Sequence, residues 1–136
     1  MIKLIVGNKG AGKTKTLINM ANEAVKNTNG NVVVVEKGLK LTYDIVHAAR
    51  LVDTEEYKIE GFNALFGFLA GLMAGNYDIT NILVDATLKI GGQDKEELAA
   101  MIDRLAGLAQ EHKVELVFTI SCGLEELPET LKGYAI

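Results

Sequence analysis

The sequence predicts an α/β fold, a three-layer sandwich in which one mainly parallel sheet of five strands has helices on both faces. Short runs rich in Val, Ile and Leu alternate along the chain with longer segments whose apolar residues recur at helical spacing. Strands that are apolar throughout, without polar alternation, are typical of parallel sheets buried on both faces. At about 100–150 residues per domain, the 136 residues predict one domain spanning 1–136.

The first predicted unit is a strand, a glycine-rich loop and a helix. Residues 2–6 are a short apolar run, and helical spacing of apolar residues continues to Val25 and stops at Asn29-Gly30. Further strands and helices follow in alternation. We expect buried strands at 31–36, 79–85 and 114–120, and helices at 62–74 and from Gly92 to Ala109.

Weaker patterns predict the remaining elements. Apolar residues at helical spacing favour a helix over 41–52, and residues 57–60 are a short candidate strand, which would be the fifth strand of the sheet. In the tail, Pro128 can begin a short helix and residues 134–136 can form an edge strand.

Charge and cysteine content exclude several classes of protein. Eighteen acidic residues outnumber 14 basic ones, giving a net charge of −4 and no basic face, which argues against binding nucleic acid or an anionic membrane. The single Cys122 excludes an internal disulfide framework and a multi-cysteine zinc site. Residues 2–6 are too short for a signal peptide or a membrane span. We therefore expect a cytoplasmic protein.

The segment from Gly7 to Thr14 fits the P-loop pattern in full and lies between a predicted strand and a predicted helix. Its glycines let successive main-chain N–H groups approach phosphate oxygens, and the start of the helix adds partial positive charge. Lys13 would contact the β and γ phosphates, and the Thr14 hydroxyl would bind Mg²⁺. The alternative is a glycine-rich turn that binds nothing. The predicted phosphate-binding residues are Asn8, Lys9, Gly10, Ala11, Gly12, Lys13, Thr14 and Lys15.

A phosphate site of this kind also needs a carboxylate for the magnesium ion. Asp85 directly follows the apolar residues 82–84 and so closes a predicted strand, at the edge of the sheet where ligands bind. We predict that Asp85 positions Mg²⁺ together with Thr14. The alternative is a structural aspartate at the end of a strand.

With these motifs the chain resembles the RecA-like group of P-loop NTPases, which includes recombinases, circadian-clock ATPases and replicative helicases. The resemblance covers nearly the whole chain, with Gly7 to Thr14 as Walker A and 82–85 as Walker B. It implies that the strand at 114–120 lies between those at 2–6 and 79–85, and that the strand at 31–36 lies beyond 79–85. It also implies that Glu36 is the catalytic glutamate that polarises water and that Ser121 is a polar sensor of the γ phosphate.

The chain departs from that group in two respects. Ala86 follows Asp85, where many ATPases carry a glutamate, so Glu36 is the general-base candidate; its alternative is a solvated strand-end residue beside Lys37. Residues 86–93 leave no room for the DNA-contacting loops of recombinases. DNA binding is therefore not expected.

Other features narrow the choice of nucleotide and reaction. The strand at 114–120 runs into Ser121-Cys122-Gly123 in place of the Asn-Lys-x-Asp segment of guanine-specific proteins, which favours ATP or loose base selection. Arg50 and Arg104 are the only arginines, too few for the mobile arginine-rich lid of a small-molecule kinase. His47 and His112 lack other metal-ligating residues at suitable spacing.

The predicted helix at 62–75 has no charged side chain. One face is apolar and suits a sheet, whereas the other carries Gly67, Gly71 and Gly75 at every fourth position, a spacing that allows a second helix to approach closely. We expect this face to bind a second copy of the chain or a protein partner. The alternative is a helix buried on both sides within one chain.

The sequence thus favours a Mg²⁺-dependent ATP-binding protein, a slow ATPase whose nucleotide state controls association with itself or with a partner. In this reading Lys13, Glu36 and Ser121 are the catalytic residues, and Thr14 and Asp85 hold Mg²⁺. The alternatives are a nucleotide-binding switch or scaffold that does not hydrolyse and, less favoured, a small-molecule kinase.

Overall fold

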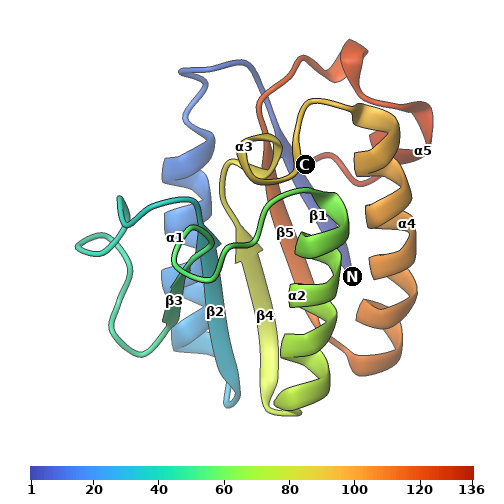
Figure 1. Ribbon diagram of the computed structural model, residues 1–136. Coiled ribbons are helices and arrows are strands. Elements are labelled where there is room, and N and C mark those ends of the chain that lie inside the picture. Colours follow the sequence, from blue (N-terminus) through green and yellow to red (C-terminus); the bar gives the residue numbers. More distant parts are fainter.

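The computed structural model describes all residues, 1–136, and contains one sheet of five parallel strands (Figure 1). The order β1-β5-β4-β2-β3 places β5 between β1 and β4, with β2 beyond β4. The predicted fold class and the strand order implied by the resemblance are therefore confirmed. The strands are β1 (Ile2–Val6), β2 (Asn31–Glu36), β3 (Arg50–Asp53), β4 (Ile79–Val84) and β5 (Glu115–Ile120).

Helices cover both faces of this sheet, as expected for connections between parallel strands. In Figure 1, α2 and α4 lie side by side on one face, and α1 lies on the opposite face behind β2. The principal helices are α1 (Lys13–Asn27), α2 (Phe62–Gly75) and α4 (Lys95–His112); shorter ones are α3 (Thr87–Gly91), the 3₁₀ turn η1 (Leu124–Glu126) and α5 (Glu129–Lys132).

Two apolar cores follow from this layering, one on each face of the sheet. The larger core lies under α2, α3 and α4 and includes Phe118 and Leu4, both fully buried. The smaller core lies under α1, where Leu17 and Ala21 pack on Val34 and Leu83. Because the same strands contribute to both cores, their apolar runs show no polar alternation.

The predictions for residues 41–60 are wrong in part. Residues 41–49 form turns and no helix, although Leu41, Ile45 and Ala49 are buried at helix-like spacing. The reason is a tertiary contact: the Asn22 side chain donates to the main-chain oxygen of Asp44 at 2.9 Å and accepts from the N–H of Val46 at 3.0 Å. These contacts satisfy main-chain groups that a helix would otherwise pair.

The fifth strand is β3, not the predicted segment at 57–60. β3 pairs with β2 in parallel, from Val33 opposite Arg50 to Glu36 opposite Asp53. The segment 57–60 instead forms a turn, with Lys58 in the left-handed region at φ 57°. Pairing with the edge of β2 therefore outweighs local apolar content in deciding where this strand forms.

The tail and the segment after β4 also differ in detail from prediction. Pro128 precedes the short α5 as expected, whereas the predicted edge strand at 134–136 is a single parallel bridge between Ala135 and Leu4. The helix α3 was not predicted. It begins after Ala86, whose φ of 53° is a left-handed conformation that sequence patterns do not reveal.

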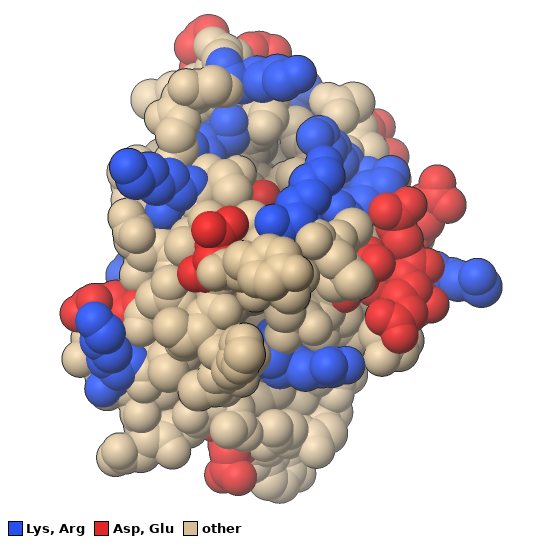
Figure 2. Space-filling model, turned by 90° about the vertical axis from the view of Figure 1, so that its left-hand side faces the viewer, with Lys and Arg blue, Asp and Glu red and all other residues tan.

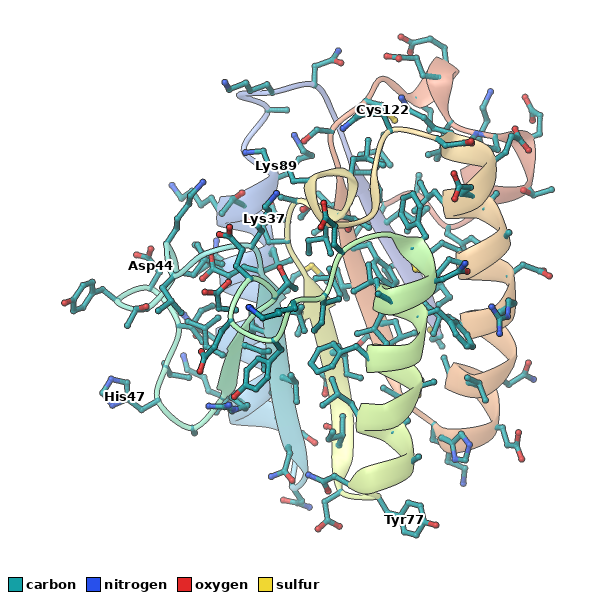
Figure 3. All side chains as sticks on the ribbon, in the orientation of Figure 1. Lys37, Asp44, His47, Tyr77, Lys89 and Cys122 are labelled. Carbon is teal, nitrogen blue, oxygen red and sulfur yellow. The ribbon has the colours of Figure 1, made fainter.

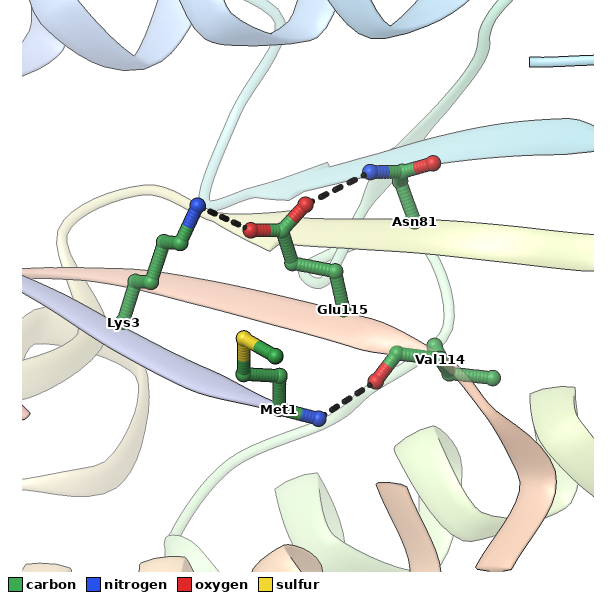
Figure 4. Close-up of polar contacts among 5 residues, drawn as sticks. All are labelled: Met1, Lys3, Asn81, Val114 and Glu115. Carbon is green, nitrogen blue, oxygen red and sulfur yellow. Dashed lines mark hydrogen bonds and ion pairs between the residues drawn. The ribbon is translucent and has the colours of Figure 1, made fainter. Parts of the chain in front are cut away.

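Polar contacts join three strands near their amino ends, on the face that α1 covers (Figure 4). Lys3 in β1 forms an ion pair with Glu115 in β5, and the other carboxylate oxygen of Glu115 accepts a hydrogen bond from Asn81 in β4 at 3.2 Å. The amino group of Met1 donates to the main-chain oxygen of Val114 at 2.9 Å. The two side chains of the ion pair are 36% and 29% exposed, and the pair contributes only about 0–1 kcal/mol.

The helix α2 is covered on one side only. Phe62, Leu65, Leu69 and Met73 are buried, whereas nothing lies within 4 Å of a β-carbon built at Gly67, Gly71 or Gly75. Gly71 and Gly75 line an open groove of about 450 Å³ between α2 and the amino ends of β2 and β3. None of the helices combines the length and the apolar character that crossing a membrane requires.

Two glycine substitutions test this packing. A β-carbon at Gly91, where α3 ends, would overlap the ring of Phe62 in α2. We expect Gly91→Ala to lower the free energy of unfolding by about 1–3 kcal/mol. The matched control is Gly107→Ala in α4, where the added carbon meets nothing and should raise the free energy of unfolding by about 0.5–1 kcal/mol. Denaturant unfolding measures both, and equal effects would contradict the packing of α3 on α2.

Candidate nucleotide-binding site

The loop between β1 and α1 adopts a conformation that only glycine takes readily at two positions. Gly10 and Gly12 have φ of 89° and 84°, and a β-carbon at Gly7 would come within 2.9 Å of the β-carbon of Ala11. In this conformation several main-chain N–H groups donate no hydrogen bond within the chain, and they belong to Gly10, Gly12, Lys13, Thr14 and Lys15. A row of free N–H groups at a helix N-terminus is an anion-binding arrangement.

Lys13 is the first residue of α1 and only 9% exposed. Its ammonium group donates to the main-chain oxygen of Asn8 at 3.1 Å, so the side chain folds back over the loop. Burying an ammonium group is costly unless an anion or hydrogen-bond acceptors compensate for the lost water. The position therefore suits a phosphate held directly above the loop.

Asp85, which follows β4, is hydrogen-bonded to two hydroxyl groups. Thr14 donates to the carboxylate at 3.2 Å from either oxygen, and Thr119 in β5 donates to Oδ1 at 2.7 Å. The Thr119 hydroxyl in turn accepts from the N–H of Ala86 at 2.7 Å. Because β5 lies between β1 and β4, its threonine can orient the aspartate toward the start of α1.

Glu36, the last residue of β2, is 3% exposed. Its carboxylate accepts hydrogen bonds from the N–H groups of Lys40 at 3.1 Å and Leu41 at 2.9 Å. Burial raises the pKa of Glu36 above its ordinary value of 4.5, and the nearby Asp85 and Asp53 act in the same direction, while the two N–H groups partly oppose the shift. A raised pKa brings a carboxyl group closer to what a general base at neutral pH requires.

These elements surround a pocket of about 550 Å³ above the carboxyl ends of the strands. Figure 2 shows the hollow, with basic residues around its rim and a small acidic area within it. Leu41 and Ala86 are its only apolar lining residues, and no aromatic ring lines it. Half of the twelve lysines of the chain line it, namely Lys9, Lys13, Lys15, Lys37, Lys40 and Lys89.

Most of the predicted site residues come together here. Glu36, Asp85 and Ser121 line the pocket with six of the eight P-loop residues, whereas Asn8 and Ala11 do not. Those two residues shape the loop, because the Ala11 N–H donates to the Asn8 oxygen at 3.1 Å. Ser121 is exposed and forms no side-chain hydrogen bond in the structure.

The remaining chemically reactive residues lie away from the pocket. Arg50 donates to the hydroxyl of Tyr57, and the guanidinium of Arg104 stacks on Phe66 at 3.7 Å from the ring centre. His47 projects from the 41–49 loop, away from the pocket residues Lys37 and Lys89 (Figure 3). Cys122 is buried, and burial raises the pKa of its thiol, which makes it less reactive.

The protein donors near the P-loop suit Mg²⁺. They are one hydroxyl, from Thr14, and one carboxylate, from Asp85, which already lie in contact. No group of three or more His, Cys, Asp or Glu residues in the chain could enclose a metal ion. Mg²⁺ commonly keeps several waters and binds through one or two protein oxygens plus phosphate oxygens. The donor set therefore fits a magnesium ion carried with a nucleotide.

Sequence reasoning missed Thr119, Lys37, Lys40 and Lys89. Thr119 lies two positions before Ser121 and is the one polar residue among the last five of β5, so its place facing the same side as Ser121 could have indicated it. The lysines carry no local signal, because their convergence depends on how the segment after β2 and the helix α3 are placed relative to the P-loop.

Comparison with known proteins supports the fold. No protein-family model and no curated protein matches the chain. Among solved structures, the chain is similar to the flagellar accessory protein FlaH from Methanocaldococcus jannaschii, with a TM-score of 0.61 and 16% identity. The likeness covers 95% of this chain but only 63% of that protein, so the chain spans less than two thirds of the length of its structural neighbour. The chain therefore shares its fold with that protein, and its strand order is the one that the RecA-like resemblance implies.

Proposed function

We propose that the protein binds ATP with Mg²⁺ and hydrolyses it slowly, and that the bound nucleotide controls association with a second copy or a protein partner. The observation that carries this proposal is the row of free N–H groups in the P-loop, placed beside Lys13 and the Thr14–Asp85 pair. In the proposal the P-loop groups bind the phosphates, and the Thr14–Asp85 pair binds the magnesium ion. Thr14 and Asp85 lie 71 residues apart in the sequence.

In this proposal the P-loop holds the phosphates. The free N–H groups of Gly10, Gly12 and Lys13 donate to phosphate oxygens, and the Lys13 ammonium, already beside the loop, contacts the β and γ phosphates. Thr14 and Asp85 provide the protein oxygens for Mg²⁺, which when bound neutralises charge on the β and γ phosphates. Thr119 keeps the Asp85 carboxylate in the orientation that this requires.

Hydrolysis needs a base for the attacking water. As water adds to the terminal phosphorus, the bond from that phosphorus to the bridging oxygen breaks, and ADP and inorganic phosphate form. We assign the proton of the water to Glu36, which lines the pocket and has a raised pKa. In the same proposal Ser121, which follows β5 and lines the pocket, contacts the γ phosphate.

A nucleotide-binding switch without hydrolysis is the second candidate function, and one observation favours it. Each carboxylate oxygen of Glu36 already accepts a main-chain N–H, from Lys40 or from Leu41. A carboxylate engaged in this way can serve to order the loop and need not act on water. Ala86, in the position next to Asp85, supplies no alternative base.

Association would use the glycine face of α2. This face is exposed and flanks the open groove beside β2 and β3, so a second helix could approach the main chain closely. Three glycines also cost helix stability, about 1 kcal/mol each relative to alanine. A binding partner would account for a face that is both uncharged and open.

Two variants separate the catalytic proposal from the switch. We expect Lys13→Ala to weaken ATP binding by about tenfold to a hundredfold, because a charge-assisted contact to phosphate is lost. Glu36→Gln should keep binding and lower single-turnover hydrolysis by about a hundredfold or more, because the general base is lost. Equilibrium titration and rapid-quench assays measure the two quantities. Hydrolysis by Glu36→Gln at the parental rate would show that Glu36 is not the base.

The pH dependence is a second readout of the same assignment. Glu36 must be ionised to accept a proton, and its pKa lies above 4.5 in the folded protein. The hydrolysis rate should therefore fall on acidification at a pH above 4.5, and this limb should vanish in Glu36→Gln. An unchanged acid limb in the variant would assign the titration to another group.

The association proposal is tested by sedimentation of Gly71→Glu. A charged side chain on this open face should be tolerated by the fold but not by an apolar interface, so the variant should be monomeric where the parent is associated. Gly107→Glu on α4, also at an open position, is the matched control. A monomeric parent with and without ATP, or an unchanged mass for Gly71→Glu, would exclude self-association through α2.

A further inference from the structure

The lysines of the pocket are not paired with acids. The three ion pairs of the protein all lie elsewhere and involve Lys3, Lys26 and Lys132. Six ammonium groups around one hollow repel one another, and the two carboxylates that line it, Glu36 and Asp85, lie more than 4 Å from each of them. Such a cluster is stabilised when an anion of several charges binds.

Three of these lysines come from the P-loop, and the others come from the segment after β2 and from α3. Lys37 follows β2 and Lys89 lies in α3, and Figure 3 draws the two near each other, above the carboxyl ends of β2 and β4. Both line the same pocket as Lys13. An anion held by the P-loop would therefore have ammonium groups on two sides.

The segment that carries Lys37 is held in place by buried or partly buried acids. The N–H of Gly38 donates to Asp53 at 2.7 Å, and the N–H groups of Lys40 and Leu41 donate to Glu36. Hydrogen bonds on both sides of the turn thus fix the main chain from which Lys37 projects. The main chain at Lys37 is therefore fixed beside the pocket, and no acidic side chain pairs with its ammonium group.

Lys89 is placed by the packing of α3. Leu88 and Ile90 on either side are buried in the larger core, whereas Lys89 is exposed toward the pocket. The N–H of Lys89 donates to the oxygen of Ala86, the N-cap of α3, at 2.9 Å, so the helix begins two residues after Asp85. Lys89 is therefore tied to the same strand end as the magnesium-binding carboxylate.

No arginine is available for this part of the pocket. Arg50 and Arg104 are engaged with Tyr57 and Phe66 outside the pocket. Because apolar lining is limited to Leu41 and Ala86, the pocket also has little to offer a nucleobase. The lining residues therefore suit the negative charge of phosphate groups better than a nucleobase.

We propose that Lys37 and Lys89 bind the terminal phosphoryl group of a nucleoside triphosphate from the wall opposite the P-loop, and so determine a preference for triphosphate over diphosphate. This inference rests on the proposed nucleotide site and adds to it the residues that distinguish a triphosphate from a diphosphate. The two lysines contribute the positive charge that arginine does not supply in this pocket. They bind phosphate and do not select the nucleobase.

The test compares two ligands in the presence of Mg²⁺: ADP and an ATP analogue whose β,γ-bridging oxygen is replaced by NH. Calorimetric titration is carried out on the parent, Lys37→Ala, Lys89→Ala and the double variant. Each single variant should lose about tenfold in affinity for the analogue, with ADP affinity changed by no more than about twofold. The double variant should bind the two ligands with similar affinity. Lys26→Ala, a surface lysine of α1 far from the pocket, controls for the change in net charge.

The outcomes separate this inference from the proposed function. If the parent binds the analogue and the lysine variants bind it equally well, the inference is wrong and the nucleotide site stands. If the variants lose equal affinity for ADP and for the analogue, Lys37 and Lys89 attract both ligands through their positive charge alone. They then do not recognise the terminal phosphate, and the inference is wrong. If a folded parent binds neither ligand, the proposed function fails and the inference fails with it.

Discussion

The candidate site depends on one constraint, the parallel pairing of β1, β5, β4 and β2 in that order. Parallel strands end at the same edge of a sheet, so the P-loop, Ser121, Asp85 and Glu36 all emerge together although they are far apart in sequence. The insertion of β5 between β1 and β4 matters most. It places Thr119 against Asp85 and directs that carboxylate to Thr14 at the start of α1.

The positive charge of the protein is concentrated at the same edge of the sheet, where the parallel strands end. The protein is acidic overall, yet half of its lysines surround the one pocket where those strands end. The net charge of the whole chain therefore says little about the ligand of this pocket, because the local field at the pocket is positive. Two carboxylates at the floor of a cationic hollow suit a polyphosphate accompanied by a divalent cation, which would occupy both kinds of group.

Local patterns in the sequence were sufficient for much of this architecture. The P-loop, Asp85 and Glu36 could be predicted because each is read from a strand and the residues that follow it. β3 and the turns at 41–49 could not, because the edge of β2 and the Asn22 side chain determine them through contacts distant in sequence. The strand pattern could have indicated that Thr119 faces the site, but not that its hydroxyl binds Asp85, which lies 34 residues away in the sequence.

The central claim is that the P-loop, Thr14 and Asp85 form one site for a magnesium nucleotide. The most direct measurement is calorimetric titration of the parent chain with ATP, first with Mg²⁺ and then with the ion chelated. The account predicts one ATP bound per chain, with affinity that falls when Mg²⁺ is removed. A folded chain that binds no ATP, or that binds it equally well without Mg²⁺, would contradict the account.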